Sequence, residues 1–291
     1  MTPPLIHRFA TGPEAALVNA YLVETATGVV AIDGTLTVSS GRALRARVEE
    51  LGKPQLAVLI THAHPDHYGG IVELVAGDDV PVIATPGVAA VIERDDAVKE
   101  AILRPMFGEE WPPARVFPNQ TVADGETLIF DGVEFTVRDL GPSESPHDSI
   151  WLLGSDRRHV FLGDQIYDRV HCYLADGFYD EWLANIARLR AELPGDATLH
   201  VGHGDAVTPA AFDWQEGYIR TFLAAVRSAD WSDAEVATAS VVSAMTAYLP
   251  GGDNQFLMQL SVAPVADKLG LLRPQTHTPA DQAANAAVRL Q

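Results

Sequence analysis

The stretch THAHPDHYGG at residues 61–70 follows the apolar run LAVLI at 56–60 and decides how the chain is interpreted. It places three imidazoles and a carboxylate on six consecutive positions, as His62, His64, Asp66 and His67. Burying four such groups without partners costs free energy, and a divalent cation removes that cost. Imidazole and carboxylate are ligands for zinc, with iron or manganese as alternatives. The stretch therefore predicts a metal site at the end of a strand.

The spacing of these side chains predicts two sets of ligands. In an extended backbone His62 and His64 project to the same side, because successive side chains alternate. Asp66 and His67 lie in the turn that follows and are expected to serve a second ion close by. Gly69 and Gly70 then predict a tight turn into a helix.

The composition is that of a globular protein of 291 residues, 47% hydrophobic and 20% charged. Lys and Arg number 20 and Asp and Glu 39, so the formal net charge is −19. This balance argues against a nucleic-acid or anionic-membrane partner and leaves a small-molecule substrate as the expected one. A single cysteine, Cys172, excludes an internal disulfide. Neither a signal peptide nor a membrane-spanning run is found, so a cytoplasmic protein is expected.

Short apolar runs broken by Gly, Asp and Pro dominate the first two thirds of the chain and predict strands. These runs cover 17–23, 29–33, 56–61, 81–84, 149–153, 159–163 and 198–201, with a hairpin inside 120–140. Helical spacing predicts helices at 39–51, 70–76, 86–93 and 179–193. Strands and helices in this order predict an α/β protein with mixed sheets.

The rest of the chain divides into three parts. Residues 95–118 are predicted to be irregular, either a surface loop or a lid or pocket wall that brings Phe107 and Trp111 to the substrate. We expect a main domain at residues 1–229 and a helical extension of it at 230–271, with one helix capped by Ser232. We expect a polar tail at 272–291. Because neither extension helix can bury its apolar face alone, the extension must pack on the main domain or on a second copy, which leaves a homodimer open.

The run at 62–67 resembles the H-x-H-x-D-H signature of the metallo-β-lactamase superfamily in full. Residues 19–23 with 32–34 resemble the opening hairpin of that family, 161–164 (FLGD) its strand ending in a bridging aspartate, and 200–204 (HVGHG) the loop of its last histidine. The resemblance implies an αββα sandwich of two mixed sheets flanked by helices. It also implies that Asp164 bridges two ions and that His203 ligates the second. Asp33 is expected to support the ligands or the fold.

The chain departs from the family pattern at the third ligand of the first metal. The family usually supplies an imidazole from a segment like G-H-T-P-G-S, and the matching stretch here is GPSESPHDSI at 141–150. Its alignment places Glu144 at that position, as in the alkylsulfatase branch, which also uses a glutamate there. His147 lies three residues later and is the alternative ligand, or else a group that supports the site or faces the substrate. A carboxylate here favours harder ions such as manganese or iron(II) beside zinc.

These residues predict a dinuclear hydrolase that binds two divalent ions, zinc above all. A hydroxide bridging the ions would attack a small ester, lactone, thioester or amide. Asp66 or Asp164 would orient the nucleophile and relay a proton, and Tyr167 and His171 are further catalytic candidates because their segment follows Asp164. Four alternatives stay open: a phosphodiesterase or a sulfatase of the same superfamily, a non-haem iron redox enzyme, and a non-catalytic binding protein.

Overall fold

The computed structural model describes residues 3–272. The first sheet contains β1 (Leu5–Ala10), β2 (Asn19–Glu24), β3 (Val29–Ile32), β4 (Gln55–Leu59), β5 (Val82–Ala84) and β6 (Gln120–Thr121). The second contains β7 (Thr127–Phe130), β8 (Val133–Gly141), β9 (Asp148–Leu153), β10 (His159–Tyr167) and β11 (Thr198–His203). The helices are α1 (Val38–Glu50), α2 (Pro65–Tyr68), α3 (Ile71–Val75), α4 (Pro86–Phe107), α5 (Tyr179–Glu192), α6 (Ala211–Ser228), α7 (Ala234–Tyr248) and α8 (Gln255–Lys268).

Both sheets are mixed, as the order of the elements predicts. Strands of the first sheet lie in chain order; β1, β2 and β3 are antiparallel, and β3 to β6 run parallel to one another. The second sheet has the order β11-β10-β9-β8-β7, with β11 parallel to β10 and the remaining neighbours antiparallel. The histidine-rich stretch follows β4 in the first sheet. The segment FLGD lies in β10 of the second sheet, and HVGHG lies at the end of β11.

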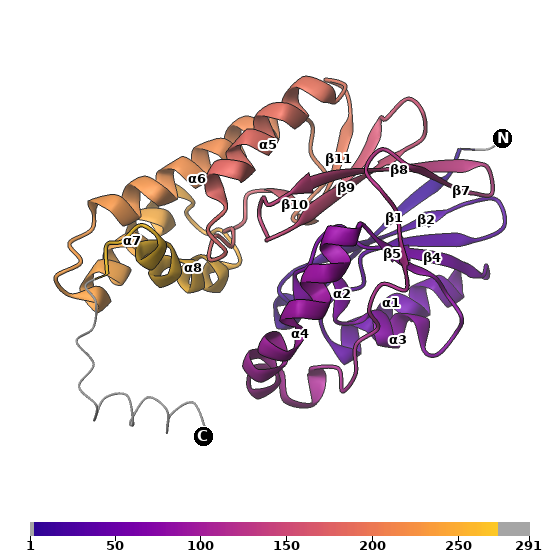
Figure 1. Cartoon of the computed structure of the whole chain (residues 1–291), viewed down its shortest axis with the longest axis horizontal. Coiled ribbons are helices and arrows are strands. Elements are labelled where there is room, and N and C mark those ends of the chain that lie inside the picture. Colours follow the sequence, from indigo (N-terminus) through magenta and orange to yellow (C-terminus); the bar gives the residue numbers. More distant parts are fainter. Residues whose placement is uncertain (1–2, 273–291) are drawn as a thin grey trace.

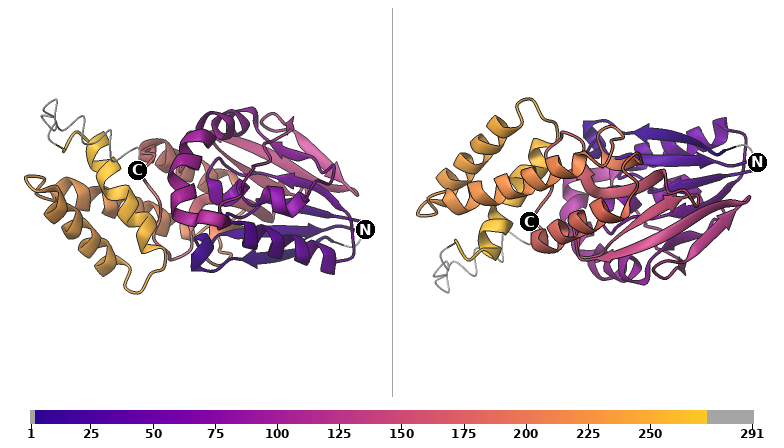
Figure 2. Two further views of the ribbon diagram at one scale, coloured as in Figure 1. Left: turned by 90° about the horizontal axis from the view of Figure 1, so that it is seen from below. Right: turned by 90° about the horizontal axis from the view of Figure 1, so that it is seen from above.

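The two sheets stack face to face between helices, so the architecture is the expected αββα sandwich (Figure 1). Helices α1, α3 and α4 pack on the outer face of the first sheet through Leu44, Leu74 and Val88. On the other side α5 and α6 cover the second sheet, and the two further views show the same layers (Figure 2). Between the sheets lies a third apolar layer that includes Trp151 and Phe161. Each sheet therefore buries both of its faces.

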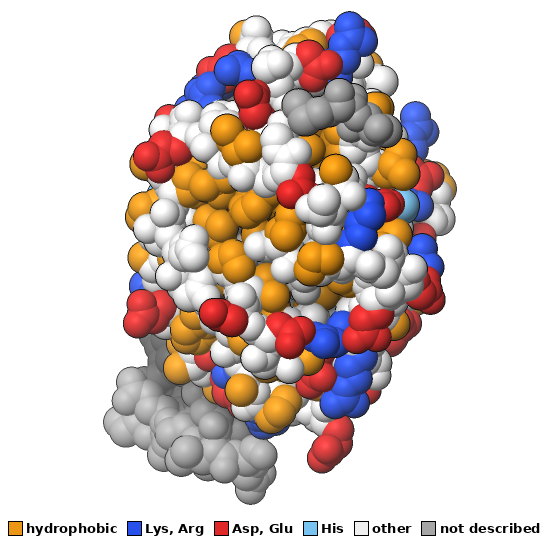
Figure 3. Space-filling view, turned by 90° about the vertical axis from the view of Figure 1, so that its right-hand side faces the viewer, with side chains coloured by type: hydrophobic (Ala, Val, Ile, Leu, Met, Phe, Trp, Pro, Cys, Tyr) orange, Lys and Arg blue, Asp and Glu red, His pale blue; other side chains and the backbone are white. Residues whose placement is uncertain are grey.

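The layer between the sheets reaches the end of the sandwich that carries the N-terminus. Partly buried Leu56, Phe130 and Val133 pack against its edge. Viewed from that side, hydrophobic side chains occupy the middle of the face and charged side chains surround them (Figure 3).

The helix α4 corrects the expectation of an irregular segment at 95–118. It begins after the cap Thr85, whose side chain accepts from the amide of Val88, and continues to Phe107. Pro105 sits near its C-terminal end, where the lost backbone hydrogen bond disturbs only the last turn. The helix ends at Gly108, whose φ of 55° is costly for other residues. The prolines therefore mark the end of the helix and do not exclude it.

The C-terminal helices share one apolar core with α6. Met245 of α7 and Met258 of α8 are fully buried in the same cluster as Phe222 of α6. The cap of α7 is Asp233 and not the expected Ser232, because the Asp233 carboxylate accepts from the amides at 235 and 236. Of the predicted tail, 273–291 lie outside the described residues. In the described part of the chain no helix combines the length and the apolar character needed to cross a membrane.

Candidate metal centre

The histidine-rich stretch forms a short connection between β4 and α2. His62 and His64 lie in extended backbone, and Asp66 and His67 lie on α2 itself. Gly70 has ordinary helical angles, so the expected tight turn is not the reason for a glycine there. A Cβ at Gly70 would lie 2.5 Å from the carbonyl oxygen of Gly34 and 3.3 Å from the Cα of Gly41. The glycine therefore allows the ligand loop to pack closely against α1.

The first group of possible ligand atoms joins the stretch to the segment after β8. His64 Nδ1 lies 2.9 Å and His62 Nε2 lies 3.6 Å from Oε2 of Glu144. All three side chains are buried, and their ligand atoms lie within 4.8 Å of one another. The structure thus brings Glu144 beside His62 and His64.

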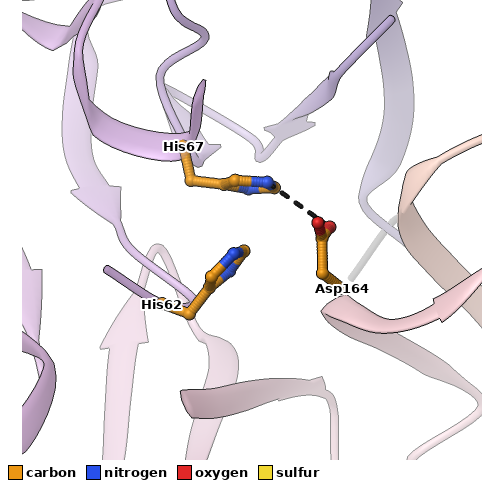
Figure 4. Close-up of side chains that lie close together, drawn as sticks. All are labelled: His62, His67 and Asp164. Carbon is orange, nitrogen blue, oxygen red and sulfur yellow. Dashed lines mark ion pairs between the residues drawn. The ribbon is translucent and has the colours of Figure 1, made fainter. Parts of the chain in front are cut away.

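The second group contains Asp66, His67 and His203. His203 Nε2 lies 3.3 Å from Oδ2 of Asp66, and His67 Nε2 lies 3.8 Å from the same oxygen. Asp164 adjoins this group, with Oδ1 3.4 Å from His67 Nε2 and Oδ2 3.2 Å from His203 Nε2. Figure 4 shows His62 and His67 facing Asp164, and possible ligand atoms of these three residues lie within 4.8 Å of one another, which makes Asp164 a neighbour of both groups.

These atoms fit divalent metal ions because many of them have no other partner. Among the described residues, buried side-chain atoms without a hydrogen bond include His62 Nε2, His67 Nε2, Glu144 Oε2, Asp164 Oδ1 and His203 Nε2. Their neighbouring N–O separations match the roughly 3.4 Å between two ligand atoms that bind one tetrahedral zinc ion at about 2.1 Å. Five unpartnered polar atoms facing the same space would be costly without a cation.

The second ring nitrogen of His62, of His64 and of His67 contacts a neighbouring side chain. Asp33 Oδ2 lies 2.8 Å from His67 Nδ1 and also accepts from the hydroxyl of Thr61, so it lies beside the loop of the possible ligands. Thr61 Oγ1 lies 3.0 Å from His62 Nδ1. Asp176 Oδ2 lies 3.0 Å from His64 Nε2, a contact that sequence reasoning missed because Asp176 is distant in the chain and belongs to no motif. Such contacts set the orientation of each imidazole.

Burial and the neighbouring charged groups shift the pKa values of the carboxyl groups in this region. Burial raises the pKa of Glu144 to about 7, against the nearby His64. Burial likewise raises the pKa of Asp148, a second carboxyl close to Glu144 that the sequence did not single out. For Asp164 burial also acts to raise the pKa, but His203 and His67 hold it well below the usual range. The carboxylate of Asp164, which lies beside both groups of possible ligands, is thus kept ionised.

Two glycines allow Asp164 to approach the histidines. Gly163, in the irregular part of the β10–β11 pairing, has a φ of 52°, and a Cβ there would lie 2.6 Å from Thr61 Oγ1. A Cβ on Gly202 would lie 1.8 Å from Asp164 Oδ1 and 2.9 Å from His67 Cε1. A side chain at Gly202 would occupy the space of Asp164, and one at Gly163 would displace Thr61, which contacts His62, so this arrangement requires both glycines.

Two candidate residues lie outside the centre. His147 Nε2 lies 2.8 Å from Asp139 Oδ1, and its ring packs against Gly87, away from the residues that line the cavity. His171 Nδ1 lies 2.9 Å from the hydroxyl of Tyr218, and burial alone accounts for its lowered pKa. Neither His147 nor His171 is therefore among the residues that line the cavity.

A cavity of about 240 Å³ opens beside the second group. Asp66, Asp164, Tyr167 and His203 line it, together with His64 and Asp176. Phe107 lines it as expected, whereas Trp111 is buried behind that wall with Leu36 and Ala15 and donates to Glu100 at 2.5 Å. The possible ligands and the cavity are thus continuous.

Two mixed sheets between helices, with buried imidazoles and carboxylates gathered beside a cavity, define an αββα sandwich with a site suited to divalent metals. The chain belongs to the metallo-beta-lactamase superfamily, whose family model matches residues 14–203. That range contains all seven possible ligands, from His62 to His203. The resemblance inferred from the H-x-H-x-D-H run is therefore confirmed.

Relatives and solved structures agree with this assignment. The chain is 24% identical over 173 residues to a hydroxyacylglutathione hydrolase of Idiomarina loihiensis, covering 59% of this chain and 56% of the relative. A second hydroxyacylglutathione hydrolase, from Prochlorococcus marinus, is 28% identical over 148 residues, half of each chain. This chain therefore spans about half the length of these curated relatives. A beta-lactamase domain protein from Burkholderia ambifaria shares the fold, with a TM-score of 0.65 and 18% identity over 92% of this chain and 86% of that one.

Proposed function

We propose that the protein is a hydrolase that depends on two divalent ions and cleaves a small ester, lactone, thioester or amide. The observation that carries the proposal is the set of five buried possible ligand atoms without a hydrogen bond, two of which belong to Asp164 and His203 in the lining of one cavity. His62, His64 and Glu144 would hold the first ion. Asp66, His67 and His203 would hold the second, with Asp164 between them. Family membership supports this reading, and the relatives named as hydroxyacylglutathione hydrolases support a thioester among the candidates.

Bound divalent ions lower the pKa of water and polarise a carbonyl oxygen. The residues of the chain then have distinct roles. Asp66 lines the cavity and is 16% exposed at its side chain, so its carboxylate could accept a proton from the attacking water through the oxygen that does not bind the ion. The water oxygen bonds to the acyl carbon, the bond from that carbon to the leaving oxygen, sulfur or nitrogen breaks, and the leaving atom takes up the proton.

Tyr167, a catalytic candidate from its place after Asp164, has a different role in this proposal. Its hydroxyl donates to Oε1 of Glu144 at 2.9 Å, and its ring stacks on His203 with centroids 5.0 Å apart. Since the hydroxyl hydrogen is already used by Glu144, we assign Tyr167 to positioning two ligands. Zinc is the metal that we propose, with manganese or iron(II) as alternatives because carboxylate ligands suit harder ions.

The test combines metal analysis with a substrate panel. Protein from cells grown with ample zinc and manganese should contain about two ions per chain. It should hydrolyse some member of a panel of lactones, aryl esters, thioesters, β-lactams, phosphodiesters and alkyl sulfates. Glu144→Ala should lose metal from one site and lose turnover, whereas the matched variant His147→Ala should retain both ions. Less than about one ion per chain in the unmodified protein would overturn the proposal.

A further inference from the structure

Two helices that are far apart in the sequence form the walls of the cavity above the metal centre. α4 contributes Ile102, Leu103, Met106 and Phe107, and α8 contributes Phe256, Leu257 and Leu260. Several of these large apolar side chains are exposed: Ile102 is 56%, Met106 58%, Phe256 41% and Leu260 51% accessible. Apolar groups from two separate helices therefore gather at one opening, where each costs free energy in contact with water.

Apart from Lys99 of α4, the charged and polar residues that line the cavity come from elements other than α4 and α8, and we call this side of the cavity its floor. Asp66, Asp164 and His203 lie there, with Asp176 and Tyr173 beside His64. Among the described residues that line the cavity, Lys99 is the lone lysine or arginine, and its ammonium group donates to the carbonyl oxygen of Ala63. The walls thus offer no free cation for an anionic carrier group, in a chain whose formal charge is −19.

The position of α8 is tied to the centre. Asn254, at the start of α8, donates to the carbonyl oxygen of Ala16 at 3.0 Å, and its amide nitrogen lies 3.3 Å from His203 Nδ1. Further along, the hydroxyl of Ser261 accepts from the amide of Leu174 at 2.7 Å. Lys268 donates to the carbonyl oxygen of Asp176. These contacts hold the apolar face of α8 opposite α4, so the wall is a built part of the site.

We propose that α4 and α8 bind the apolar part of the substrate, an extended alkyl or aryl acyl group without charge, while the bond to be cleaved lies on the polar floor. This inference rests on the proposed hydrolase function and narrows its substrate class. Continuity of the apolar walls with Asp66 and His203 in one cavity supports a substrate as the occupant. The burial of each additional methylene between the helices should then favour longer acyl chains.

The kinetic test uses metal-loaded protein and p-nitrophenyl esters from acetate to decanoate. We expect kcat/KM to rise about threefold for each added methylene until the cavity is filled. Ile102→Asn should reduce the preference for octanoate over acetate by about tenfold, because it places a polar group on the wall. Ile129→Asn is the matched control, since Ile129 is 64% exposed on β7, at the opposite end of the sandwich from α8 (Figure 1). Leu260→Asn and Leu5→Asn form a second matched pair, with 51% and 56% exposure.

A binding measurement separates this inference from the proposed function. Calorimetry with 1-octanol and 1-butanol needs no turnover, and 1-octanol should bind more tightly, with Ile102→Asn weakening it and Ile129→Asn leaving it unchanged. If no ester is cleaved but this pattern holds, the hydrolase proposal fails and the apolar site stands. If esters are cleaved with no dependence on chain length, or if Ile102→Asn and Ile129→Asn behave alike, the inference is overturned. A change in oligomeric mass in Ile102→Asn with unchanged chain-length preference would overturn it too, because the face would then be a subunit interface.

Discussion

The hydroxyl of Tyr167 donates to Oε1 of Glu144 at 2.9 Å, while Oε2 of the same carboxylate faces His62 and His64. The two oxygens of Glu144 thus have separate neighbours. Oε1 is held by Tyr167 on β10 of the second sheet, and Oε2 lies next to the histidines of the loop after β4. Under the proposed ligand set, the hydroxyl of Tyr167 would set the orientation of Glu144 from outside the ligand group.

Replacing Tyr167 by Phe tests this relationship. The variant keeps the ring that stacks on His203 and removes only the hydroxyl, so Glu144 is held less firmly. We expect metal affinity to fall by about 10- to 100-fold and the free energy of unfolding to fall by roughly 1–2 kcal/mol. Metal titration and denaturant unfolding measure the two effects. A lower kcat with unchanged metal affinity would instead assign the hydroxyl to the reacting substrate.

Gly202→Ala should damage the centre although it replaces none of the possible ligands. The added Cβ would lie 1.8 Å from Asp164 Oδ1, so the carboxylate must move. We expect a loss of about 1–3 kcal/mol in unfolding free energy together with weaker metal binding. Gly195→Ala is the control, because a Cβ there meets nothing within 4 Å, and its effect should stay within about 0.5 kcal/mol. Equal effects of the two substitutions would contradict the steric argument.

His200 predicts a pH dependence of stability. Burial, with a smaller contribution from His159, lowers its pKa from 6.5 to about 4. The unfolded chain therefore takes up a proton at higher pH than the folded one, and stability present above pH 6.5 is lost as the pH falls toward 4. This group alone should cost about 2 kcal/mol between pH 8 and pH 5. His200→Phe, which preserves the stacking on Phe161, should show a shallower decline in unfolding free energy over that range. Identical pH profiles would rule out His200 as the cause.

Removal of the helical extension tests the proposed division of the chain at residue 229. A chain of residues 1–229 exposes the face of α6 that contacts Met245 and Met258, and it loses the contacts of Asn254 near His203. We expect it to aggregate, or to unfold with roughly 3 kcal/mol less free energy than a chain of residues 1–272. Chemical denaturation and gel filtration provide the comparison. A soluble, monomeric 1–229 chain of equal stability would show that the extension is dispensable for the fold.

The sequence by itself determined the family, the architecture and the order of the chemical groups. The run at 62–67 is local, and so is the alternation of apolar strands with Gly, Asp and Pro that predicts two mixed sheets. Because these patterns are local, the bounds of strands β2 to β5 and β7 to β11 were predicted to within a few residues of those in the structure. Glu144 was assigned from its distance to Pro146 within one segment, and the structure places it beside His62 and His64.

Only the tertiary structure decided which distant groups meet. Asp176 and Asn254 contact the histidines although no spacing relates them to the motif. His171 follows Asp164 closely in the chain but turns toward Tyr218, because the segment after β10 packs on α6. The apolar wall of the cavity depends on α4, which continues past its expected end, and on α8 from the other end of the chain. Local patterns encode a strand, a cap or a ligand run, whereas contacts between elements distant in sequence depend on how the layers pack.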